Sequence, residues 1–202
     1  MIPKRIIYVW VGGKEKPEAV KKCIDSWRKH MPDWEYLEIN EDNFDVNINE
    51  YCKKAYGSKH WAYVSDIARL WALYTYGGIY MDTDVFVYKP LDKFLTHNFF
   101  TGFEQVHYPI TATMGANKGN ELIKEMLDTY DTKIFETHEN WYEYETNTMI
   151  LSDVLSKYFD RDNMTYQENE KGAIYPKETF CNGDIDENTY ARHLMLGGWS
   201  SE

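Results

Sequence analysis

A strand–helix–strand pattern at the amino terminus restricts the fold more than any other feature of this sequence. Residues 6–11 are β-branched and aromatic and stop at Gly12-Gly13, which predicts a buried strand that ends in a flexible turn. Helical periodicity follows over Glu18–His30, directly after Pro17, and residues 36–39 predict a second strand. Two strands joined through a helix run parallel in one sheet, so the sequence predicts an α/β fold.

The next predicted helix, residues 60–76, has the clearest periodicity in the chain. Its apolar positions recur every three or four residues and predict a core-facing stripe of Trp61, Val64, Ala68, Trp71 and Thr75. Asp66 and Arg69 lie one turn apart on another edge of this helix, where a surface ion pair is the simplest interpretation. Gly77-Gly78 predicts the end of the helix.

The rest of the chain extends this pattern without a convincing linker. Strands are predicted at residues 79–81, 85–88 and 98–103, and helices at residues 120–130 and 146–159. The chain has 202 residues, of which 43% are hydrophobic. This length suits a single α/β domain, so we expect one domain over residues 1–202.

Charge and cysteine content exclude several classes of function. The formal net charge is −11, which would repel a nucleic-acid backbone, so we expect no nucleic-acid partner. Cys23, Cys52 and Cys181 are widely separated, so neither a disulfide framework nor a zinc site is expected. Because the amino terminus also lacks a signal-peptide-like apolar stretch, we expect a cytoplasmic protein.

Asp82-Thr83-Asp84 is the strongest candidate for chemistry. The two carboxylates follow an apolar strand, and on an extended segment they would point to the same side, with Thr83 turned away. Neighbouring carboxylates need a compensating cation, and hard oxygen ligands favour Mg²⁺ or Mn²⁺. Such an ion neutralises a diphosphate leaving group. Two solvated acids in a surface turn are the alternative interpretation.

Two blocks of sequence resemble the family 32 glycosyltransferases, which carry a DXD sugar-binding region, and the related glucosylating bacterial toxins. The first block is Ile7-Tyr8-Val9-Trp10-Val11-Gly12-Gly13. The second combines Ser65-Asp66-x-x-Arg69 with Tyr76-Gly77-Gly78-Ile79-Tyr80-Met81-Asp82-Thr83-Asp84. Their joint occurrence is more specific than either block alone. The resemblance implies a GT-A-type nucleotide-sugar-binding fold: a single Rossmann-like mixed sheet flanked by helices.

The same resemblance implies a UDP-sugar donor, a divalent metal and transfer with retention of configuration. By position, Trp10 would stack on uracil, the Val9 backbone would contact its edge, and Tyr80 would support the ribose or phosphates. A place in the core is the alternative for both aromatic residues. Asp66 and Arg69 would bind the donor sugar, with Ser65 nearby. Asp82 would contact the ribose and a metal-bound water, and Asp84 would ligate the metal directly.

Candidate residues in the second half of the chain are fewer. Members of the resembled family tend to end with a His, a spacer and a Ser-Trp pair, whereas here His193 is followed by Gly197-Gly198-Trp199-Ser200. We expect His193 to be a third metal ligand through its neutral imidazole, and Trp199 to close over the donor. Glu143, Glu145 and Asn147 lie where an acceptor would approach, although helix capping explains Asn147 equally well.

The sequence therefore favours a hexosyltransferase that uses Mn²⁺ (or Mg²⁺) and a UDP-sugar and acts on a glycan or lipid-linked acceptor. Surface-polysaccharide synthesis, with peripheral association at the inner membrane face, follows by analogy only. Two alternatives stay open. A haloacid-dehalogenase-like phosphatase would use Asp82 as nucleophile and Asp84 as general acid. A non-catalytic carbohydrate-binding domain would need neither metal nor nucleotide.

Overall fold

The computed structural model describes residues 1–138, 145–181 and 183–197. Its centre is an eight-stranded mixed sheet in the order β2-β1-β3-β7-β5-β9-β8, with β6 paired to β5. β1 (Arg5–Val9) lies between β2 (Glu35–Ile39) and β3 (Gly78–Met81) and runs parallel to both. The predicted α/β class, with its parallel β1–α1–β2 unit, is confirmed.

The remaining strands make the sheet mixed, and their directions bring several strand ends to one edge. β7 (Thr113–Ala116) is inserted antiparallel between β3 and β5 (Phe99–Gln105). β9 (Gly172–Tyr175) runs parallel to β5, and β8 (Gln167–Asn169) and β6 (Tyr108–Pro109) pair antiparallel at the periphery. Because β3 and β5 both oppose β7, they run in the same direction as β1, and the three strands end at one edge.

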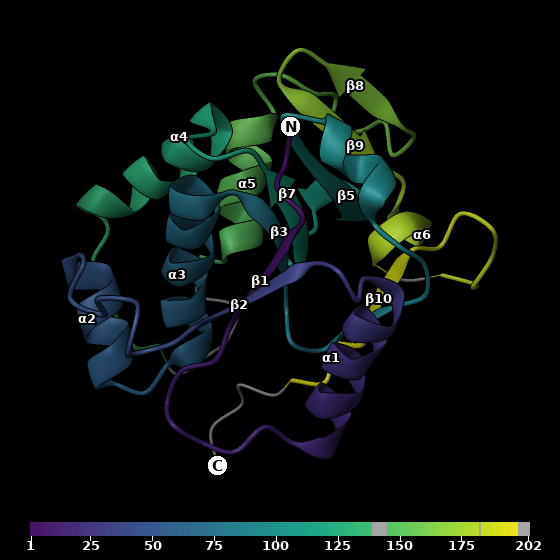
Figure 1. Cartoon of the computed structure of the whole chain (residues 1–202). Helices are drawn as coiled ribbons and strands as arrows, with labels where there is room; N and C mark the ends of the chain where they lie inside the picture. Colours follow the sequence, from purple (N-terminus) through teal and green to yellow (C-terminus); the bar gives the residue numbers. More distant parts are fainter. Residues whose placement is uncertain (139–144, 182, 198–202) are drawn as a thin grey trace.

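Helices cover both faces of the sheet (Figure 1). One core cluster lies under α2 (Glu50–Gly57), α3 (Trp61–Tyr76), α4 (Glu121–Thr129) and α5 (Asn147–Leu155). A second core cluster lies on the opposite face under α1 (Glu18–His30) and α6 (Lys177–Phe180). Short 3₁₀ turns cover Asp92–Thr96 and Tyr130–Thr132. Apolar residues on both faces thus bury β3 and all of β1 after Arg5, whereas the outer strand β2 stays partly exposed.

Most predicted helices lie where expected, with some differences at their ends. α1 has the predicted bounds, whereas α5 ends at Leu155, earlier than predicted. The Thr146 hydroxyl caps α5 by accepting a hydrogen bond from the Met149 backbone, so capping chemistry operates at this helix start. α2 was not predicted; the Asn49 side chain caps it by accepting from the Cys52 N–H.

The predicted core stripe of α3 is only partly correct. Val64 and Ala68 are buried, but Trp61, Trp71 and Thr75 are only partly buried. α2 and α4 pack against α3 beside the sheet, so burial extends around most of the helix, including Asp66 and Arg69. A surface ion pair at these two positions is therefore wrong, because the sheet edge at Asp82 and the start of α5 at Asn147 cover that side of the helix.

A second, two-stranded sheet brings the end of the described chain back to the centre. β4 (Val85–Val87) pairs antiparallel with β10 (Ala191–His193). The Trp27 indole of α1 donates a hydrogen bond to the Val85 carbonyl at 2.6 Å, which anchors this small sheet to the second core cluster. None of the helices in the described ranges combines the length and apolar character that a membrane span requires.

Candidate functional site

The candidate site lies at the edge where β1 and β3 end. β1 and β3 pair with Ile7 opposite Tyr80, so continuing this register by two residues brings Val9 level with Asp82. The loop after β1 and the Asp82–Asp84 segment after β3 are therefore neighbours. Ligands of open α/β sheets bind at such a carboxyl edge.

The acidic segment forms a turn and not the extended conformation that the sequence suggested. The Asp82 N–H donates to the Ala112 carbonyl, and the Val85 N–H closes back onto the Asp82 carbonyl at 3.0 Å. Thr83 is buried at 7% exposure. The turn, and not strand alternation, therefore sets the directions of the two carboxylates.

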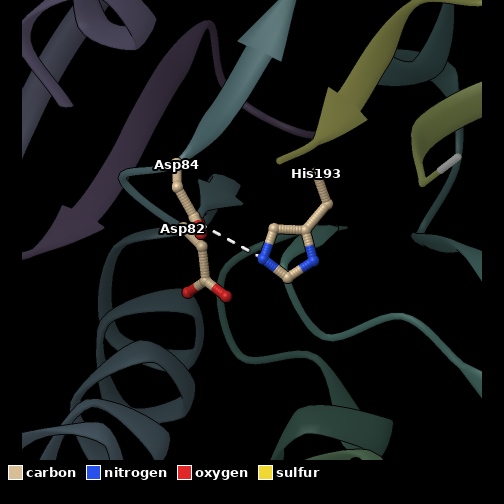
Figure 2. A group of neighbouring side chains, drawn as sticks. All are labelled: Asp82, Asp84 and His193. Atoms are coloured by element: carbon tan, nitrogen blue, oxygen red, sulfur yellow. Dashed lines mark ion pairs between the residues drawn. The ribbon is translucent and has the colours of Figure 1, made fainter. Parts of the chain in front are cut away.

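Asp82, Asp84 and His193 form one compact group of potential metal ligands (Figure 2). One ligand atom from each residue lies within 4.8 Å of the others, and His193 Nε2 is 3.2 Å from Asp84 Oδ1. The pairing of β4 with β10 places His193 opposite Val85 and so beside the acidic turn. Backbone N–H groups of the same segment hold Asp84: Leu194 donates to its carbonyl and Leu196 to Oδ2, both at 3.0 Å.

The charges of this group compensate one another. Burial alone would raise the pKa of Asp84, but the hydrogen bond and charge of His193 bring it below its usual value. Burial alone would likewise lower the pKa of His193, but Asp84 and Asp82 raise it. The group therefore favours a positive charge between two acids. Two carboxylate oxygens and an imidazole nitrogen suit a divalent cation such as Mn²⁺.

Arg69 lies on the other side of Asp82, where α3 faces the sheet edge. Its Nη2 is 3.2 Å from Asp66 Oδ1 and 3.3 Å from Asp82 Oδ1. Nη2 also donates to the Ser65 hydroxyl, while Nη1 donates to the Thr111 carbonyl and Nε to the Ser65 carbonyl. With a side chain only 6% exposed, Arg69 links the two acids and fixes the direction of Asp82.

Burial controls the ionisation of the residues around Arg69. Burial raises the pKa of Asp66 to about 6, although Arg69 opposes this change. Tyr80 is 1% exposed, and its hydroxyl donates to Asp82 Oδ1 at 2.6 Å. The Arg69 guanidinium lies 4.6 Å from the centre of the Tyr80 ring. Tyr80 thus belongs to the core and touches the site through Asp82, while the expected contact with ribose or phosphate stays a prediction.

Trp10 is the first residue of the loop that follows β1, next to the Asp82 turn. It is only partly buried, its indole N–H donates to the Lys14 carbonyl at 2.7 Å, and the Lys16 ammonium lies 5.4 Å from its ring centre. Val9 is buried at 1% exposure, so a ligand would contact it through its backbone and not through its side chain. Sequence reasoning missed Lys16, a cation that interacts with the ring expected to stack on uracil.

Several predicted residues contribute less to this arrangement. Trp199 and Glu143 lie outside the described residues. Glu145 forms an ion pair with Lys133. Asn147 is 2% exposed, and its amide donates to the Tyr130 hydroxyl and to the Asp66 carbonyl, which places the start of α5 against the Asp66–Arg69 pair.

Sequence reasoning also missed Glu104. The predicted strand at residues 98–103 continues in the structure to Gln105, and this extension carries Glu104 to the same edge. Burial raises its pKa, and the charges of His193 and Asp82 both act on it. The sequence signal that could have identified Glu104 was a single acidic residue at the end of an apolar strand.

Comparisons with known proteins agree with this geometry. The family model "Glycosyltransferase sugar-binding region containing DXD motif" matches residues 17–101. "Glucan organizing enzyme 1" of Cryptococcus neoformans is 26% identical over 180 residues, which cover 88% of this chain and 38% of that protein. "Inositol phosphoceramide mannosyltransferase 3" of Schizosaccharomyces pombe is 27% identical over 171 residues, covering 78% and 46% respectively. The chain thus spans less than half the length of these relatives.

Solved structures support the fold. The PaToxG glycosyltransferase has a TM-score of 0.52 at 21% identity and covers 77% of this chain and 68% of its own. A glycosyltransferase involved in glycosylation of the major capsid of PBCV-1 has the same TM-score at 14% identity, covering 96% and 94%. The GT-A-type fold class is therefore confirmed. The expected resemblance is confirmed as well: residues 17–101 match the sugar-binding region of the DXD-motif glycosyltransferases, and the chain is similar to a bacterial toxin glycosyltransferase in fold.

Proposed function

We propose that this chain forms one GT-A domain that transfers a hexose or N-acetylhexosamine from a UDP-sugar to a glycan or lipid-linked acceptor. In this proposal Asp84 and His193 hold a divalent cation, Mn²⁺ or Mg²⁺, directly, and Asp82 reaches it through water. The observation that carries the proposal is the compact group of Asp82, Asp84 and His193 at the carboxyl edge of the sheet, beside the Trp10 loop.

Each residue contributes a separate part of donor binding. When bound, the cation supplies two positive charges that neutralise the departing diphosphate. Trp10 offers its ring to the base, and the Val9 backbone approaches the edge of the base. Arg69 keeps Asp82 aligned, because its guanidinium lies 3.3 Å from that carboxylate. Asp66, fixed by the same guanidinium, would accept a hydrogen bond from a sugar hydroxyl.

The chemical step that we propose depends on positioning. The acceptor hydroxyl attacks the anomeric carbon on the face from which the diphosphate leaves, and a donor phosphate oxygen takes its proton. The bond from the sugar to the diphosphate breaks as the new glycosidic bond forms. The resemblance alone supports this retention of configuration.

The acceptor class follows from the relatives by analogy. The names of two fungal relatives describe mannosyl transfer to inositol phosphoceramide, and a third name describes glucan organisation. These names support a lipid-linked or polysaccharide acceptor and a hexose donor. A role in surface-polysaccharide synthesis and a cytoplasmic location are predictions that rest on analogy.

The phosphatase alternative fits the structure less well. It needs Asp82 as a free nucleophile, whereas this carboxylate accepts a hydrogen bond from Tyr80 and faces Arg69. A carbohydrate-binding module would have no use for acids that share a cation site with His193. The match to the glycosyltransferase region also favours transfer.

A donor screen tests the proposal. UDP-sugars and a nucleotide-activated mannose are incubated with the protein, with and without Mn²⁺, and nucleotide release is measured. Asp84→Ala should abolish metal-dependent release and leave the melting temperature near that of wild type, because it removes a direct ligand. Asp25→Ala, at an exposed position of α1, is the matched control and should retain full activity. Unchanged release by Asp84→Ala would refute the metal assignment.

A further inference from the structure

Glu104 reaches the metal group from a strand that the proposed mechanism does not use. The register of β5 against β6 shifts between Phe103 and Gln105, so Glu104 lies in a β-bulge, a feature that re-aims side chains near active sites. Phe103 packs into the core cluster under α3, whereas the charge of Glu104 acts on groups of the opposite face. Burial raises the pKa of the Cys181 thiol on that face, and the Glu104 charge raises it further. Glu104 also adds to the effect of Asp84 and Asp82 that raises the pKa of His193.

The Glu104 carboxylate is partly buried and unpartnered. Burial raises its pKa, the nearby Asp82 adds to this effect, and His193 opposes it. Within residues 1–138, 145–181 and 183–197, no hydrogen bond or ion pair engages this carboxylate. A desolvated carboxylate without a partner is unfavourable for the fold, so its position needs another explanation.

The imidazole of His193 has a buried nitrogen that could donate a hydrogen bond to this carboxylate. Nε2 faces Asp84, while Nδ1 is buried and has no hydrogen-bond partner in the described part of the chain. A histidine that offers Nε2 to a cation carries its hydrogen on Nδ1. Histidine ligands of metals nearly always donate this hydrogen to a carboxylate, a carbonyl or a water, which fixes the ring.

Among the acids around His193 in the described part of the chain, one is available for that contact. The carboxylates that act on its ring are Asp84, Asp82 and Glu104. Asp84 faces Nε2 through one oxygen and accepts the Leu196 N–H with the other. Asp82 is engaged by Tyr80 and Arg69. Glu104 is the acid without a partner.

We propose that Glu104 is the positioning residue of the metal centre: it accepts a hydrogen bond from His193 Nδ1, directly or through one water, when Nε2 is turned to the cation. The inference rests on the metal-dependent transfer proposed above. It makes the centre a set of four residues drawn from three places in the fold: the turn after β3, the strand β10 of the small sheet and the bulge in β5.

Manganese affinity tests this role without depending on activity. Free Mn²⁺ is measured by electron paramagnetic resonance as the full chain is titrated without donor. Glu104→Leu should raise the Kd for Mn²⁺ by about 10- to 100-fold, as loss of such a supporting contact does. Glu104→Gln should raise it by about three- to tenfold, because the amide oxygen still accepts but one charge is lost. Glu187→Gln removes an exposed charge from the segment before β10 and should stay within about twofold of wild type.

The melting temperature of each variant without metal shows whether it folds. If Glu104→Leu folds and binds Mn²⁺ as wild type does, the inference is overturned; if it does not fold, an unchanged Kd for Glu104→Gln overturns it. Loss of transfer with unchanged Mn²⁺ affinity would instead place Glu104 at the acceptor and also overturn it. Failure of the wild-type chain to bind Mn²⁺ would remove the metal site itself, which is a separate and recognisable result.

Discussion

Replacing Arg69 with methionine tests whether this residue holds the site together from within the core. Arg69 is buried, and its guanidinium lies within 3.3 Å of both Asp66 and Asp82. Methionine matches much of its length but carries no charge. Both acids would then be left in a partly desolvated place without their shared cation.

The expected loss of stability follows from these contacts. Breaking a buried ion pair by removing one partner costs about 3–5 kcal/mol, because an uncompensated charge remains. Arg69→Met leaves two such carboxylates and also removes the hydrogen bond to the Thr111 carbonyl. We therefore expect a loss at the upper end of this range, a large part of the 5–15 kcal/mol that typically stabilises a domain.

Urea unfolding followed by tryptophan fluorescence measures this loss. Combining Arg69→Met with Asp66→Asn should recover about 1–2 kcal/mol, because one of the two unpaired charges is then removed. Arg28→Met, at an exposed position of α1, is the control and should change stability by less than about 1 kcal/mol. A loss below about 1 kcal/mol for Arg69→Met would show that solvent reaches these acids, and the argument from burial would be wrong.

Three other changes test separate parts of the structure. Burial raises the pKa of Asp66 to about 6 from 3.8, so between these pH values the folded state holds a proton that the unfolded state has lost. The stability of wild type relative to Asp66→Asn should therefore fall as the pH rises through this window and then level off. Urea unfolding midpoints at a series of pH values measure this difference. Trp10→Ala should weaken UDP binding by about 1–3 kcal/mol in calorimetry, and a loss of folding would instead place Trp10 in the core. Gly12→Ala should lower the melting temperature more than Gly13→Ala does: both glycines have positive φ, but a Cβ at Gly12 would lie 2.7 Å from the Trp61 ring, whereas one at Gly13 meets nothing within 4 Å. Equal effects of the two substitutions would contradict this steric account.

Local patterns in the sequence were sufficient for the first half of the fold. The periodicity of Glu18–His30 and the β-branched run before Gly12 predicted the β1–α1–β2 unit, because a helix or a buried strand leaves its own repeat in the sequence. The apolar strand running into Asp82 and Asp84 likewise identified the acids of the candidate site. These features depend on neighbours along the chain.

Contacts between distant segments could not be predicted in this way. The insertion of β7 between β3 and β5, and the pairing of β10 with β4, join strands whose sequences say little about their partners. The same limit explains why the Asp66–Arg69 pair looked like a surface pair. Three- and four-residue spacing shows that two side chains share a helix edge, but not which distant segment covers that edge.

Local patterns were thus enough to establish the α/β class, the acidic pair and the helix that carries Arg69. The folded chain adds that Arg69 is buried between two acids, that the acidic segment turns, and that His193 and Glu104 reach it from distant strands. The physical reason is that charge interactions and burial depend on distance in space, whereas the repeats that a sequence displays report only on residues a few positions apart.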